Sequence, residues 1–138
     1  MRYFDASALV KRYVRERGTA KVQRLLTSDV AVTSRLSAVE IASALARRAR
    51  EGAFSDAARD RAVAALDADL ASMLVVELTA AVVARAQALV RRHALRAGDA
   101  IQLASCLYIQ EAVGEKTSLV AFDDRLAKAA RLEDLAVD

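Results

Sequence analysis

The chain has 138 residues, of which 55% are hydrophobic and only 4% aromatic, and its formal net charge is +3. This length predicts a single domain spanning residues 1–138, with an aliphatic core and an apolar content too high for disorder. No apolar run approaches the ~18 residues of a membrane helix. Because Cys106 is the only cysteine, no intrachain disulfide can form, and we expect a cytoplasmic protein without a membrane partner.

Short apolar strands alternate with helices along the chain. In chain order, the pattern predicts a strand at 2–5, helices at 7–16 and 20–26, a strand at 30–33, helices at 37–52 and 55–73, a strand at 74–78, helices at 79–93 and 98–112, a strand at 118–122, a helix at 123–132 and a short strand at 135–138. This alternation favours an α/β fold, in which helices cover both faces of a mostly parallel sheet of four or five strands.

Carboxylates recur where predicted strands end or helices begin. Asp5 ends the first strand, and Glu40 lies in the first turn of the helix after the second strand. Asp99 opens a later helix, and Asp123 and Asp124 follow the fourth strand. Ligands of parallel sheets bind at the carboxyl ends of the strands. We therefore expect these side chains to converge on one edge of the sheet.

Each carboxylate also has a purely structural explanation. The aspartates could cap the helices that follow them, and Ser37 and Glu40 have the spacing of a capping box. These explanations are weaker for the group than for its members, because the carboxylates are predicted to share one edge.

The residue types favour a hard metal ion over other chemistry. Carboxylates gathered without basic partners repel one another unless a cation is present, and oxygen-only ligand sets suit Mg²⁺ or Mn²⁺. His93 is the only histidine and Cys106 the only cysteine, which disfavours a zinc site. Ser7 has no evident basic partner for nucleophilic catalysis, and the chain has no glycine-rich phosphate loop.

Four segments in order resemble the signature blocks of PIN-domain ribonucleases, and most of all the VapC-type toxins of toxin–antitoxin pairs. The segments are "YFDASALVKRYVRE", "SRLSAVEIASALARR", "LRAGDAIQLAS" and "LVAFDDRLAKAA". The resemblance covers essentially the whole chain. It implies a three-layer α/β/α sandwich and an endoribonuclease that needs Mg²⁺ or Mn²⁺, forms a homodimer and is inhibited by a cognate antitoxin protein.

The resemblance also implies roles for individual residues. Asp5, Asp99 and Asp123 would bind the metal ion, and Glu40 would bind it or accept a hydrogen bond from water at the ion. Ser7 would orient Asp5 or a water molecule. All five are predicted catalytic residues.

One position departs from the family pattern. The family often has Thr or Ser two residues before the last Asp, where this chain has Ala121. Without that hydroxyl, Asp124 is an alternative to Asp123. We favour Asp123, because successive strand residues point to opposite sides and only one of the two should face the site.

An RNA substrate requires cations beside the acids, because phosphate contacts determine affinity. Arg47 and Arg48 lie on the helix that carries Glu40, and Arg12 and Arg96 lie near the other motifs. We predict these four arginines as RNA-binding residues, although a solvated helix face would explain the Arg47–Arg48 pair equally well. Apolar surface on the helices at 7–16 and 37–52 could form a groove for an antitoxin helix.

Two other functions fit parts of the pattern. A phospho-receiver domain also has an acidic Mg²⁺ site at strand ends, but its adjacent acids usually follow the first strand and a Lys ends a late strand. A PIN fold that only binds protein or RNA, without catalysis, would be consistent with Ala121.

Overall fold

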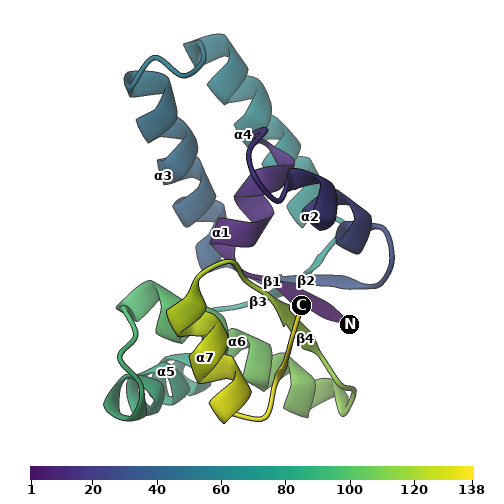
Figure 1. Cartoon of the computed structure of the whole chain (residues 1–138), viewed down its shortest axis with the longest axis vertical. Coiled ribbons are helices and arrows are strands. Elements are labelled where there is room, and N and C mark those ends of the chain that lie inside the picture. Colours follow the sequence, from purple (N-terminus) through teal and green to yellow (C-terminus); the bar gives the residue numbers. More distant parts are fainter.

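The computed structural model describes all residues, 1–138, and has a five-stranded sheet at its centre (Figure 1). The strands are β1 (Arg2–Phe4), β2 (Ala31–Ser34), β3 (Leu74–Val76), β4 (Ser118–Val120) and β5 (Ala136–Val137). Their order is β3-β2-β1-β4-β5, and every neighbouring pair is parallel. This confirms the predicted parallel sheet.

Helices connect the strands and cover both faces of the sheet (Figure 1). They are α1 (Ala6–Leu9), the short 3₁₀ helix η1 (Val10–Arg12), α2 (Thr19–Leu26), α3 (Leu36–Arg50), α4 (Asp56–Leu70), α5 (Ala80–Arg92), α6 (Ala97–Val113) and α7 (Asp124–Leu132). None of them combines the length and the hydrophobicity needed to cross a bilayer.

Alternate strand residues enter two separate cores, which is the period-two pattern of a sheet buried on both faces. Tyr3 and Leu119, paired in register, pack into the core beneath α5, α6 and α7. Phe4 and Val120, the next pair, pack into the core beneath α1, α2, α3 and α4. The predicted three-layer α/β/α sandwich is therefore confirmed.

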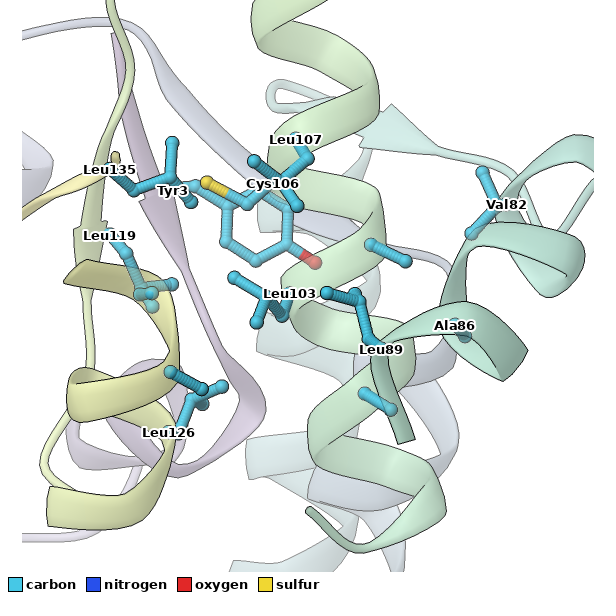
Figure 2. Close-up of a cluster of buried hydrophobic side chains, with 14 of the residues drawn as sticks. Tyr3, Val82, Ala86, Leu89, Leu103, Cys106, Leu107, Leu119, Leu126 and Leu135 are labelled. Atoms are coloured by element: carbon cyan, nitrogen blue, oxygen red, sulfur yellow. The ribbon is translucent and has the colours of Figure 1, made fainter. Parts of the chain in front are cut away.

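The core between the sheet and α6 contains a polar group that matters for the site. Tyr3 reaches from β1 toward α6 and lies beside Leu103 and Cys106 (Figure 2). Its hydroxyl donates a 2.7 Å hydrogen bond to Gln102 Oε1. Every buried side-chain nitrogen and oxygen in the protein has a hydrogen-bond partner, as the high cost of an unpaired buried polar group requires.

Two predicted helix boundaries were wrong because the capping residues differ from those expected. The first helix begins at Ala6, because Asp5 and not Ser7 is its N-cap, and it tightens into η1 after Leu9. The third begins at Leu36, so that Ser37 lies inside the helix and is fully buried. The strands β3 and β4 are also shorter than predicted.

The order in which the strands are added across the sheet reverses next to β1, although all the strands remain parallel. The chain runs from β1 outward through β2 to β3 and then returns to β4 on the other side of β1. Open α/β sheets bind ligands at such a switch point, outside the carboxyl ends of the strands. Asp5 follows β1 directly and Asp123 follows β4 after two residues, so both lie at this position.

Candidate active site at the carboxyl edge of the sheet

One pocket at this edge, with a volume of about 590 Å³, collects all five predicted catalytic residues. We call it the acidic pocket. Its lining includes Asp5, Ser7, Glu40, Asp99 and Asp123, together with four basic side chains, Glu16, Gln102 and Phe122. The predicted convergence of the acids on one edge is thus observed, and α1, α3, α6 and the ends of β1 and β4 all contribute to it.

Asp5 is the most buried of the acids, with 3% of its surface exposed. Its Oδ1 accepts a 2.7 Å hydrogen bond from the backbone N–H of Ala8 and its Oδ2 accepts one of 2.7 Å from Ser7 Oγ. Burial, with smaller contributions from the charges of Asp99 and Glu40, raises the pKa of Asp5 to about 6 despite these two hydrogen bonds. Asp5 therefore both caps α1 and presents a carboxylate to the pocket.

Glu40 is held by an uncharged donor. Gln102 Nε2 donates a 2.7 Å hydrogen bond to Glu40 Oε2. The pKa of Glu40 is raised, first by its partial burial and then by the charge of Asp99. The capping-box interpretation of Ser37 and Glu40 was wrong, because Ser37 lies within α3 and its hydroxyl is 2.8 Å from Thr33 Oγ1 and 3.0 Å from Gln102 Nε2.

Gln102 is a site residue that the sequence prediction missed. It is 2% exposed and connects Tyr3 of β1 to Ser37 and Glu40 of α3. An amide three residues after Asp99, on a helix that is otherwise apolar around it, is the sequence feature that could have identified it. This network fixes the position of Glu40 relative to the sheet.

Asp99 lies in the first turn of α6 and is half-buried. Burial raises the pKa of its carboxyl group, and the charge of Asp123 raises it further. The neighbouring Gly98 makes room for Glu40, because a Cβ at residue 98 would lie 2.6 Å from Glu40 Oε1. A side chain at residue 98 would therefore displace the Glu40 carboxylate.

Asp123 and not Asp124 lines the pocket. Asp123 is the N-cap of α7, and its Oδ1 accepts a 2.8 Å hydrogen bond from the backbone N–H of Leu126. Asp124 is exposed in the first helical turn. The hydroxyl that Ala121 lacks is not needed to hold Asp123, because the helix backbone orients its carboxylate.

The donor set suits Mg²⁺ or Mn²⁺ in its chemistry, since it consists of carboxylate oxygens with no histidine or thiolate. No three Asp, Glu, His or Cys side chains lie close enough to hold one ion together in this arrangement. Binding an ion would require the carboxylates to move closer. Asp123 has room to do so because it is exposed and only Oδ1 is held by a hydrogen bond.

The basic residues of the pocket fall into two groups. Lys11 and Arg48 both bind Glu16, at 2.8 Å and 2.5 Å, whereas Arg47 and Arg96 form no ion pair although they line the same pocket.

Arg12 does not reach the pocket, because its guanidinium is paired with Asp69 of α4 at 2.6 Å. The sequence prediction grouped Arg12 with the other three arginines, and the structure separates it from them.

Phe122 is a further residue that the prediction did not include. It is 41% exposed, directly precedes Asp123 and lines the pocket. Lys11 Nζ lies 4.5 Å from the centre of its ring, within the range of a cation–π interaction. Gly18, with a positive φ, packs so closely that a Cβ there would lie 2.6 Å from the ring.

Comparison with known proteins finds a matching family model and relatives named as ribonucleases. The family model described as PIN domain matches residues 2–132. Ribonuclease VapC45 and Ribonuclease VapC49, from two strains of Mycobacterium tuberculosis, are each 42% identical over 129 residues, which cover 89% of this chain and 83% of each relative.

Solved structures share the fold at lower sequence identity. Mycobacterium tuberculosis VapC20, described as a sarcin-ricin loop cleaving toxin, superimposes with a TM-score of 0.70 at 20% identity and covers 94% of this chain and 95% of its own. A toxin–antitoxin complex from Klebsiella pneumoniae gives a TM-score of 0.64 at 15% identity, covering 92% of this chain and 91% of its own.

The raised pKa of Asp5 predicts a pH-dependent effect of Asp5→Asn on stability. A carboxyl group whose pKa rises from 3.8 to about 6 on folding makes the folded state lose stability as pH increases through that interval. The substitution removes this loss. The difference in free energy of unfolding, Asp5→Asn minus wild type, should therefore be more positive at pH 7 than at pH 4, by ~3 kcal/mol at most.

Urea denaturation of both proteins across this pH range measures the difference. Asp67→Asn is the control, since Asp67 is an exposed α4 carboxylate without an ion pair. A difference between Asp5→Asn and wild type that does not change with pH would contradict the burial argument.

Proposed function

This chain belongs to the PIN domain family, and from that premise we propose that it is an endoribonuclease that requires Mg²⁺ or Mn²⁺ and acts as the toxin of a toxin–antitoxin pair. The observation that carries the proposal is the convergence of Asp5, Glu40, Asp99 and Asp123 on one pocket at the sheet edge. Relatives named as ribonucleases at 42% identity over most of the chain support the same activity.

Asp5, Asp99 and Asp123 are the residues that would hold the ion, with Glu40 beside them. Burial and mutual repulsion raise the pKa of Asp5, Glu40 and Asp99, and a divalent cation would relieve that repulsion. When bound, such an ion would make water more acidic and offset the negative charge that develops on a phosphate.

The remaining residues would orient the acids and the RNA. Ser7 and the Ala8 N–H hold both oxygens of Asp5, and Gln102 holds one oxygen of Glu40. Arg47 and Arg96 carry guanidinium groups without a carboxylate partner and would bind phosphate oxygens on either side of the acids. Arg48 and Lys11 would contribute less, because Glu16 already binds both.

A cognate antitoxin and a second copy of the chain are the proposed protein partners. Solved structures of the same fold are described as toxin–antitoxin assemblies, among them the Klebsiella pneumoniae complex and VapBC2 from Rickettsia felis. An antitoxin arginine entering the acidic pocket would pair with carboxylates that have no basic partner within the chain.

The alternative is a PIN fold that binds RNA or protein without cleaving it. The spacing of the acids favours it, because no three of them lie close enough to hold one ion together in this arrangement. The phospho-receiver interpretation has no comparable support, since the chain belongs to a different family.

Cleavage of a small-RNA pool by the purified, partner-free protein tests the proposal. Wild-type protein should give discrete fragments with Mn²⁺ or Mg²⁺ and none with EDTA. Asp5→Asn should lower the cleavage rate by ~100-fold or more, because it removes a charge at the reacting centre. Asp124→Asn, the matched control at an acid outside the pocket, should cleave normally. Equal cleavage by wild type and Asp5→Asn would contradict the assignment of Asp5 as a catalytic residue.

Gly98→Ala should separate activity from stability. The new Cβ would displace the Glu40 carboxylate, and misplacement of a site group by about 1 Å can cost ~100-fold in rate. Stability should be unchanged or higher by ~1 kcal/mol, because Ala is the better helix former. The measurement is cleavage rate against melting temperature.

A double-variant comparison identifies the cause of that rate loss. In a Glu40→Ala background, adding Gly98→Ala should change the rate no further, since the displaced group is already gone. A second, additive rate loss in that background would show that residue 98 acts by some route other than Glu40.

A further inference from the structure

A second pocket lies between the segment that joins α5 to α6 and one face of α7. We call it the basic pocket. Its volume is about 300 Å³, at the lower end of the ~300–1,000 Å³ range of ligand sites. It is lined by Arg92, His93, Ala94, Leu95, Arg125, Lys128, Ala129 and Leu132. None of these residues is acidic, and none is a Phe, Tyr or Trp.

A third pocket, which we call the hollow and which has a volume of about 590 Å³, connects the basic pocket to the acidic pocket. This hollow is lined by Asp99 and Asp123, which also line the acidic pocket, and by Ala94 and Arg125, which also line the basic pocket. Arg96 lines both the hollow and the acidic pocket. The three pockets therefore form one continuous path across the surface, from the acids along α7 as far as Leu132.

Three of the cations along this path are available to a ligand. Arg96, Arg125 and Lys128 form no ion pair and no side-chain hydrogen bond, and all three are exposed. In contrast, Lys11 and Arg48, on the other side of the acidic pocket, are both bound by Glu16. A polyanion leaving the acids toward α7 would meet cations that need not first release a carboxylate.

The far end of the basic pocket is fixed by a small ionic cluster. Glu133 binds Arg92 at 3.0 Å and His93 at 2.6 Å. These contacts tie the end of α5 to the end of α7 and keep the pocket walls in place. They also leave Arg125 and Lys128, one turn apart on α7, as the two unpaired charges of the pocket.

We propose that Arg125 and Lys128 form a phosphate-binding subsite for the stretch of single-stranded RNA next to the cleaved bond. This inference rests on the proposed function, which places that bond in the acidic pocket. The subsite would contact the backbone and not the bases, because its lining offers cations and aliphatic side chains and no aromatic platform on which a base could stack. It would add affinity without sequence preference.

The salt dependence of RNA binding tests the subsite. Binding of a fluorescein-labelled single-stranded RNA is measured by anisotropy at several salt concentrations, in EDTA so that the RNA stays intact. Loss of two phosphate contacts in the Arg125→Gln/Lys128→Gln variant should weaken binding and make the slope of log affinity against log salt less steep by ~1.4.

The matched control is Arg131→Gln/Lys116→Gln. It removes one arginine and one lysine that are exposed, form no ion pair and lie outside the three pockets. The subsite is supported if the control has a slope and affinity close to wild type while the Arg125→Gln/Lys128→Gln variant, called the α7 variant, shows the expected change. Equal effects in the two double variants, or no effect in either, would overturn it.

Two further readouts separate this proposal from others. If the α7 variant binds RNA normally but loses binding to poly-L-glutamate, the pocket serves an acidic polypeptide and the RNA subsite is overturned. If wild-type protein cleaves no RNA but the salt slope still depends on Arg125 and Lys128, the proposed ribonuclease fails, and the two residues remain a phosphate-binding site for RNA that is bound without cleavage. If wild-type protein cleaves RNA in a metal-dependent way and the KM is the same in the Arg125→Gln/Lys128→Gln variant, the proposed ribonuclease stands and the subsite is overturned.

Discussion

A buried carboxylate at the end of the central strand is the feature on which the site depends. Asp5 is 3% exposed, and two uncharged hydrogen-bond donors are its only partners. Strand β4 lies parallel to β1, on the side opposite β2, so the residues after β4 reach the same edge of the sheet as Asp5. Three more carboxylates without a basic partner, Glu40, Asp99 and Asp123, then line the same pocket, and their repulsion makes the edge a place where positive charge is favoured.

Neutral donors hold three of the acids, and none of the four basic side chains that line the pocket forms an ion pair with Asp5, Glu40, Asp99 or Asp123. Gln102 binds Glu40, the backbone N–H of Leu126 binds Asp123, and Ser7 binds Asp5. Had an arginine paired with Asp5, it would have lowered the pKa and occupied the place of a cation. Glu16 instead draws Lys11 and Arg48 to the rim. No basic side chain of this chain therefore occupies the place of an ion, and the unpaired cations lie where phosphates would pass.

The sequence predicted the layers, the parallel sheet and the convergence of the acids, because the alternation of apolar strands with helices and the carboxylates at strand ends are visible in the local pattern. It could not predict the contacts that depend on how helices pack. The link from Gln102 to Glu40 crosses from α6 to α3, and the close contact between residue 98 and the Glu40 carboxylate arises only from that approach. Likewise Arg12 lies near Asp5 in sequence, but its guanidinium turns to Asp69 on α4, which no local rule foretells.

Binding of Mn²⁺ as a function of pH, followed by calorimetry on wild type, Asp5→Asn and Asp124→Asn, tests the central claim most directly. If the buried, mutually repelling carboxylates form the ion site, wild-type affinity should rise as pH increases through about 6, where Asp5 loses its proton, with protons released on binding. The same behaviour should persist in Asp124→Asn and disappear in Asp5→Asn. Equal Mn²⁺ affinity in all three proteins, with no change across that pH range, would contradict the account.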